Sequence, residues 1–71
     1  MVFVEAHHPN GLWWNVTRAS KPEEVDRTKN WYRAQLEGLT GARIDLVDRD
    51  GRNEQLLARE TFTDRGWTEA R

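Results

Sequence analysis

Two short apolar segments near the start of the chain are separated by residues typical of a turn. Residues 2–8 read VFVEAHH and residues 12–18 read LWWNVTR, so both carry β-branched and aromatic side chains. Between them, Asn10-Gly11 is a pair of residues that can adopt the positive backbone φ of a tight turn at little energetic cost. The pattern predicts a β-hairpin over residues 2–18.

A helical pattern follows this hairpin. Ser20 and Glu23 have the spacing of a capping box, and Pro22 stands in the first turn, where its missing N–H costs little. Glycines beyond the pattern supply a C-terminal stop. The sequence therefore predicts a helix over about residues 21–37. Its apolar stripe, expected to pack on the sheet, consists of Val25, Tyr32, Leu36 and Leu39.

A second pair of segments follows the helix. Residues 42–47, ARIDLV, alternate in polarity as a strand does, and DRDG at 48–51 is a turn sequence. Residues 54–62, EQLLARETF, are expected to return as a fourth strand. A short helix remains the alternative there, because most of these residues favour helices. Residues 63–71 are expected to be a polar tail, unless Trp67 anchors them.

The order of these elements predicts an α+β fold, a ββαββ antiparallel sheet of about four strands in two hairpins with one helix packed on one face. Residues 1–62 form the single domain of this prediction, and residues 63–71 form its C-terminal tail. A single helix covers only one face of a sheet. The other face, called the open face below, is left for water, a partner or a second copy of the chain.

Alternation along the strands divides their side chains between the two faces, because neighbouring residues of a strand point in opposite directions. Trp14 is thereby predicted to lie in the core beneath the helix and Trp13 on the open face. The helix-facing set is Val2, Val4, Ala6, Leu12, Trp14, Val16, Ile44 and Leu46. The open-face set is Phe3, Glu5, His7, Trp13, Asn15, Thr17, Arg43, Asp45, Val47, Leu57, Arg59 and Thr61.

The composition of the chain excludes several classes of function. Four tryptophans among 71 residues favour a folded domain despite 32% charged residues. Eleven basic against twelve acidic residues give a net charge of −1, so no overall field attracts nucleic acid or an acidic membrane. Cysteine is absent, which excludes disulfides and thiolate metal sites and favours a cytoplasmic location. The first residues contain neither a basic region nor a long apolar run, so no signal peptide or membrane anchor is expected.

Candidate chemistry is sparse. His7 and His8 are adjacent, and in a strand they point apart, so we expect no metal site from them. Glu5 and His7 are two residues apart on one face and could form an acid/base pair. Such a pair also needs a pocket and a positioned substrate, for which a two-layer domain of this size has little room. The sequence therefore predicts a protein that is not an enzyme and that uses no cofactor.

The apolar residues expected on the open face indicate binding. Phe3, Trp13, Val47 and Leu57 predict contact with another protein or self-association, including a homodimer. Single-strand nucleic-acid binding is the alternative, with bases stacked on the rings and Arg43 and Arg59 following the backbone.

The sequence leaves two positions open for each of Trp67 and Trp31. Trp67 and the tail could fold back and cover the open face instead. Trp31 lies about 120° from Val25 around the helix, near the edge of the polar side, so it packs at the edge of the core or makes a second contact.

In composition the chain resembles the small orphan proteins of tailed phages from GC-rich actinobacteria: nine Arg against two Lys, many tryptophans and no cysteine. This resemblance covers composition alone and points to no site residue. It implies a host-directed or regulatory binding protein rather than a metabolic enzyme.

Overall fold

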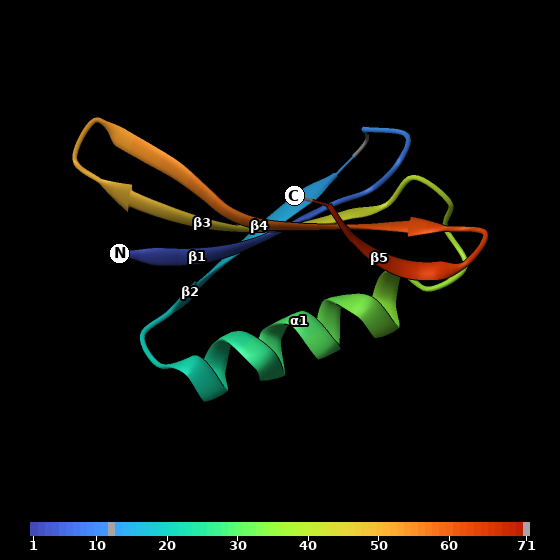
Figure 1. Ribbon diagram of the computed structural model, residues 1–71, viewed down its shortest axis with the longest axis horizontal. Helices are drawn as coiled ribbons and strands as arrows, with labels where there is room; N and C mark the ends of the chain where they lie inside the picture. Colours follow the sequence, from blue (N-terminus) through green and yellow to red (C-terminus); the bar gives the residue numbers. More distant parts are fainter. Residues whose placement is uncertain (12, 71) are drawn as a thin grey trace.

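The computed structural model describes residues 1–11 and 13–70, which form an antiparallel sheet with one helix against one face (Figure 1). The predicted α+β class and the strand, strand, helix, strand, strand order are confirmed, and a further strand follows. The elements are β1 Val2–His7, β2 Trp14–Ala19, α1 Pro22–Leu36, β3 Arg43–Asp50, β4 Asn53–Thr63 and β5 Gly66–Ala70.

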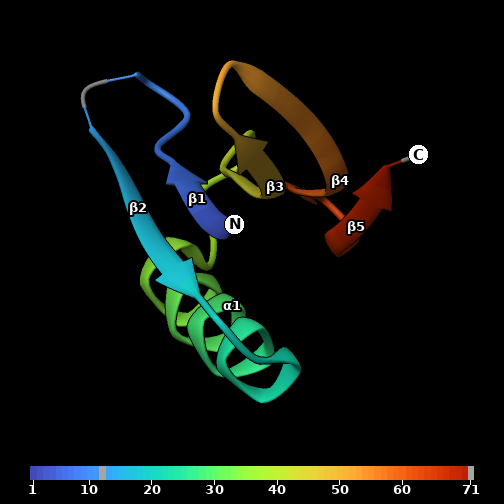
Figure 2. The same cartoon turned by 90° about the vertical axis from the view of Figure 1, so that its left-hand side faces the viewer.

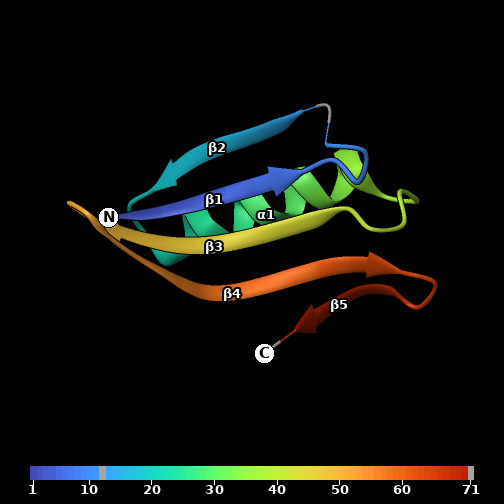
Figure 3. The ribbon, with the colours of Figure 1, turned by 90° about the horizontal axis from the view of Figure 1, so that it is seen from above.

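The spatial order of the strands is β2-β1-β3-β4-β5, with every neighbouring pair antiparallel (Figure 3). The two hairpins therefore meet where β1 pairs with β3, which places residue 5 opposite residue 45. Strands β2 and β5 form the two edges of the sheet.

The helix lies below the sheet (Figure 2). It buries the stripe that its spacing predicts. Tyr32 and Leu36 are 1% and 0% exposed, and Val25 and Leu39 pack against the same cluster. The sheet contributes small and branched side chains to this core, because they fit closely beneath a helix. Its buried members are Val4, Ala6, Ala19, Tyr32, Leu36, Ala42 and Ile44.

The start of the helix differs in detail from the predicted capping box. Lys21 is the N-cap residue and makes no side-chain capping bond. The N–H of Ser20 instead donates to Oε2 of Glu24 at 3.0 Å, so the carboxylate that reaches back is one residue later than expected.

The prediction for the faces of β2 is wrong. Thr17 pairs with Val4 and therefore shares the helix-facing side, where its hydroxyl is hydrogen-bonded to that of Tyr32 at 2.6 Å. Trp14 pairs with His7 on the open face and is 59% exposed. The turn after His8 sets this register, and in a hairpin the register decides which face each side chain takes. Asn15 follows Thr17 to the helix-facing side, and Val16 and Arg18 follow Trp14 to the open face.

The second hairpin settles the choice left open for residues 54–62, which belong to strand β4. Strand β3 continues to Asp50, through three of the four residues predicted as a turn. The β3–β4 register shifts between Leu46 and Val47, so that both Leu56 and Leu57 lie opposite Val47 in a β-bulge. The two leucines are 47% and 46% exposed.

The segment expected as a polar tail contains β5. Trp67 pairs with Phe62 across β4 and β5, and their rings meet edge to face with centroids 5.3 Å apart. Both side chains pack against the core on the helix side. Trp67 therefore anchors the end of the chain in the core and does not cover the open face.

Within the described part of the chain, no helix has both the length and the apolar character needed to cross a membrane.

Candidate functional site

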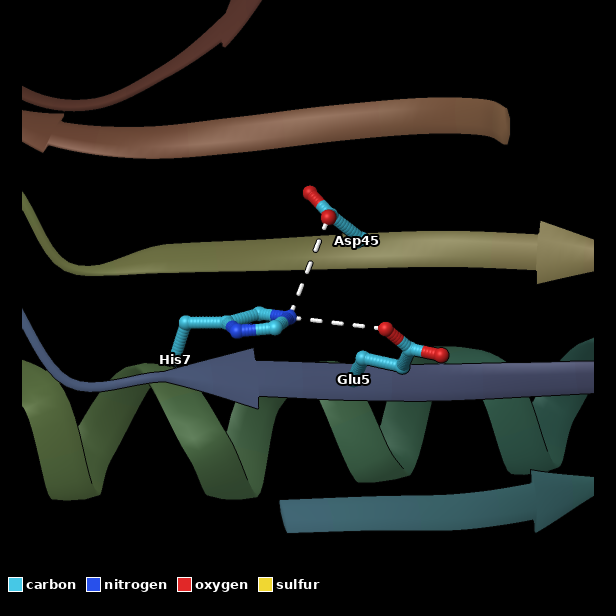
Figure 4. A group of neighbouring side chains, drawn as sticks. All are labelled: Glu5, His7 and Asp45. Atoms are coloured by element: carbon cyan, nitrogen blue, oxygen red, sulfur yellow. Dashed lines mark ion pairs between the residues drawn. The ribbon is translucent and has the colours of Figure 1, made fainter. Parts of the chain in front are cut away.

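The open face carries two buried carboxylates at its centre. Glu5 on β1 lies beside Asp45 on β3, its partner in the sheet register (Figure 4). The two residues are only 6% and 3% exposed. Burial of a carboxylate is unfavourable unless cations and hydrogen bonds compensate it. The surrounding side chains therefore determine what these acids can do.

Three arginines supply that compensation. Arg59 donates to both oxygens of Asp45, from Nε at 2.9 Å and from Nη2 at 3.1 Å, and Arg43 Nε donates to Asp45 Oδ2 at 3.1 Å. Arg49 Nη2 donates to Glu5 Oε2. The hydrogen bond to Asp45 raises the pKa of Arg59 above its ordinary value, against a smaller opposing effect of desolvation. Arg59 thus remains a cation throughout the pH range in which proteins fold.

His7 completes the cluster. Its Nε2 lies 3.4 Å from Glu5 Oε1 and 3.9 Å from Asp45 Oδ2, and this nitrogen is buried without a hydrogen-bond partner among the described residues. Glu5, His7 and Asp45 offer three ligand atoms within 4.8 Å of one another, a donor set suited to a divalent cation. Asp45 Oδ2 already accepts hydrogen bonds from Arg43 and Arg59, whereas the guanidinium bond to Glu5 goes to Oε2 and not to the Oε1 that faces His7. A bound cation would therefore compete with the two arginines at Asp45.

Of the apolar residues expected on this face, Leu57 is 46% exposed, but Val47 and Phe3 are less available than the sequence indicated. Val47 is 3% exposed. The guanidinium of Arg49 lies over the ring of Phe3, 5.4 Å from its centroid, in a cation–π contact. Phe3, Val47, Arg43 and Arg59 all lie on the open face, as expected from alternation.

Trp13 is absent from that face, which corrects its predicted position. It precedes β2 and packs against His8, with ring centroids 5.9 Å apart, and is 39% exposed. Trp14, predicted in the core, occupies the open face instead, where it stacks on His7 with ring centroids 5.9 Å apart and ring planes within 8°.

The exposed tryptophans gather around the edge strand β2. Trp14 flanks β2 on the open face, while Trp13 and the 57% exposed Trp31 of α1 flank it on the helix side. A hollow of roughly 410 Å³ separates Trp13 from Trp31, and a second one of roughly 250 Å³ lies between Thr17 and Trp31. Strand β2 is thus an unpaired edge with indole rings on both of its sides.

Sequence reasoning missed two contributors to these surfaces. The DRDG sequence predicts Arg49 in a turn, although the period-two series Arg43, Asp45, Val47 continues to Arg49 and assigns it to the open face. Alternation along residues 12–18 predicts Trp14 in the core. The register required by a turn at Asn10 would have placed it opposite His7 instead.

Comparisons of the chain with protein-family models, with curated proteins and with solved structures found no match.

Proposed function

We propose that this chain is a small, non-enzymatic binding module that contacts another protein chain along the edge strand β2. The observation that carries the proposal is the gathering of three of the four tryptophans, each more than a third exposed, around this one strand. The contact surface comprises Trp13, Trp14 and Trp31 with the free edge of β2, and is called the β2 surface below.

Two physical properties of the β2 surface support protein binding. An edge strand offers a row of N–H and C=O groups to which an extended segment can add as a further strand. Tryptophan is the residue type most enriched among those that dominate binding energy at protein interfaces, because a large rigid ring buries much apolar area with little loss of entropy. The β2 surface combines both properties.

The network on the open face weighs against the nucleic-acid alternative. Arg43 and Arg59 would have to contact phosphates, and both are engaged by the buried carboxylate of Asp45. A phosphate would compete with that carboxylate for the same donors. Protein contact requires no such exchange, since the three tryptophans of the β2 surface are already exposed.

Site-specific photo-cross-linking in the producing cells tests this proposal. A benzophenone side chain in place of Trp14 is expected to form adducts with protein. The same group in place of Thr68, an exposed residue on the opposite edge strand β5, is expected to form none. Nuclease-sensitive adducts from position 14, or no adducts at all, would overturn the proposal.

Substitution then measures the contribution of the rings. Trp14→Ser and Trp31→Ser are each expected to weaken the captured interaction about 30-fold, the effect of a residue worth about 2 kcal/mol at an interface. Leu56→Ser is the matched control, because Leu56 is a similarly exposed apolar residue away from β2. Titration by calorimetry or fluorescence anisotropy measures all three. Equal losses for Leu56→Ser and Trp14→Ser would refute the assignment of the surface.

A further inference from the structure

We infer that the partner of the β2 surface is a second copy of this chain, whose own β2 pairs antiparallel with the first and places Val16 opposite Val16. This inference rests on the proposed function and names its partner. The result would be a continuous sheet of two five-stranded halves related by a two-fold axis through Val16.

The backbone of β2 determines which groups are free for this pairing. The N–H of His8 donates to the C=O of Trp13 at 3.1 Å, so residue 13 directs its polar groups towards β1. In an antiparallel pair such hydrogen-bonded positions alternate with positions that point away. The β1–β2 register contains no irregularity. The backbone N–H and C=O groups that point away from β1, past the edge of the sheet, are consequently those of Trp14, Val16 and Arg18.

A two-fold axis through Val16 satisfies all of these outward groups at once. Val16 then exchanges both of its hydrogen bonds with Val16 of the second copy, and Trp14 exchanges both of its bonds with Arg18 of the second copy. A centre at Thr17 would leave the outward groups of Trp14 beyond the reach of the partner's outward positions. The spacing of free groups therefore selects one register.

The side chains agree with this register. Trp14 and Arg18 lie on the open face, directly opposite each other across the two copies, where a guanidinium can stack on an indole ring. No like charges face each other, because each Arg18 meets a tryptophan. The pairing thereby gives both exposed side chains a complementary neighbour.

On the helix side the same axis brings the two Trp31 side chains towards each other. Trp31 borders the hollow that contains Asn15 and the one that contains Thr17, so it lies level with the centre of β2. In the proposed pair Asn15 stands opposite Thr17 of the second copy. The second helix then runs antiparallel to the first and covers the hollows that Trp31 borders in each copy.

The other side of the sheet is less suited to the same pairing. Residues 53–58 of β4 extend past β5, but this free stretch carries the bulge at Leu56 and Leu57, and a bulge interrupts strand addition. Strand β2 is six residues long and has neither a bulge nor a proline. Because the β2 contact uses the same patch on both copies, it closes at two chains.

Sedimentation of the purified full chain from micromolar to near-millimolar concentration provides the first test. The expected species has twice the monomer mass of 8.4 kDa. Val16→Pro removes an N–H that points away from β1, so the monomer keeps its fold while the dimer is expected to dissociate at least 30-fold more readily. Arg18→Glu is expected to weaken the dimer about 10-fold and Arg18→Lys to leave it within threefold. Circular dichroism confirms that each variant is folded.

A single-cysteine variant tests the register, since the natural chain contains no cysteine. Hydrogen-bonded partners in an antiparallel pair have Cα atoms about 5.5 Å apart, within the range that a disulfide spans. Val16→Cys is therefore expected to form a reducible dimer under mild oxidation, and Thr68→Cys on β5 to form none at the same rate.

The outcomes separate this inference from the proposed function. A chain that stays monomeric at all concentrations, while a photo-reactive group at position 14 still captures a different protein, overturns the dimer and leaves the binding function standing. A dimer that survives Val16→Pro, or that cross-links equally fast through Thr68→Cys, overturns the proposed register.

Discussion

Asp45 is the least exposed of the three buried acids, the others being Glu5 and Glu60. Its two oxygens accept hydrogen bonds from Arg43 and Arg59, so one carboxylate links two cations of the open face. Both arginines remain more than a third exposed and can be hydrated if the acid is removed. Substitution of Asp45 should therefore cause only a moderate loss of stability. The hydrogen bonds to the buried carboxylate are lost, but the two arginines are not left buried and unpaired.

We expect Asp45→Asn to lower the free energy of unfolding by about 2 kcal/mol, the usual worth of hydrogen bonds to a charged group. Urea denaturation measures this change. Asp64→Asn, at an exposed turn residue, is the control and should change the free energy by less than about 0.5 kcal/mol. If Asp45→Asn left the free energy of unfolding unchanged, the network would not stabilise the fold.

Residue types alone predict the open face only in part. Alternation places Phe3, Glu5, His7 and Asp45 correctly, since β1 and the first part of β3 are regular. It does not reveal that Asp45 attracts two guanidinium groups. That arrangement depends on β3 lying between β1 and β4, which is a property of the assembled sheet.

At the scale of elements, the orientation of β2 shows the limit of hydrophobic patterning. Trp14 and Val16 are its most apolar residues, and a pattern argument buries them. The hairpin register exposes both residues and turns Thr17 towards the helix instead. The hydroxyl of Thr17 is hydrogen-bonded there to the hydroxyl of Tyr32. Register outweighs apolarity here because shifting it by one residue would disrupt every β1–β2 backbone bond.

The helix has a polar attachment to the sheet as well as an apolar one. Glu60 on β4 is 7% exposed and accepts hydrogen bonds from Arg33 of α1 at 2.9 and 2.7 Å. Lys29 Nζ lies 3.3 Å from the same carboxylate. This carboxylate therefore ties two successive turns of α1 to β4.

Glu60→Gln is expected to lower the free energy of unfolding by about 1–3 kcal/mol, because two charge-assisted bonds are weakened while the shape is kept. Hydrogen exchange should show faster exchange in α1 than in β1. Glu54→Gln, at a half-exposed position on the same strand, is the matched control. Unchanged exchange in α1 would mean that apolar packing alone holds the helix.

At the scale of the whole molecule, the fifth strand enlarges a core that would otherwise be small. A chain of 71 residues buries a modest share of its surface, and its total stability is of the order of 4–10 kcal/mol. Trp67 and Phe62 extend the apolar cluster beyond the helix towards the second edge of the sheet. The sequence of residues 63–71 predicts a tail because eight of these nine residues are polar or small. Only pairing of β5 with β4 gives Trp67 a partner.

Trp67→Ala is expected to destabilise the fold by about 3 kcal/mol, the lower end of the usual cost of such a truncation in a core. Thermal and urea unfolding measure the loss. Trp31→Ala removes the same ring from an exposed position of the monomer and should cost less than about 1 kcal/mol at concentrations where the chain is monomeric. Similar losses for the two variants would contradict the placement of Trp67 in the core.

Because the four indole rings have unequal surroundings, the tryptophan fluorescence of the natural chain can report on binding without a label. Trp13, Trp14 and Trp31 lie where a collisional quencher such as acrylamide reaches them, whereas Trp67 packs against Phe62 and the core. Occupation of the β2 edge should shield the first three from the quencher and leave the emission of Trp67 unchanged. Unfolding should instead shift the emission of Trp67 to the red, so one unlabelled sample distinguishes association from loss of structure.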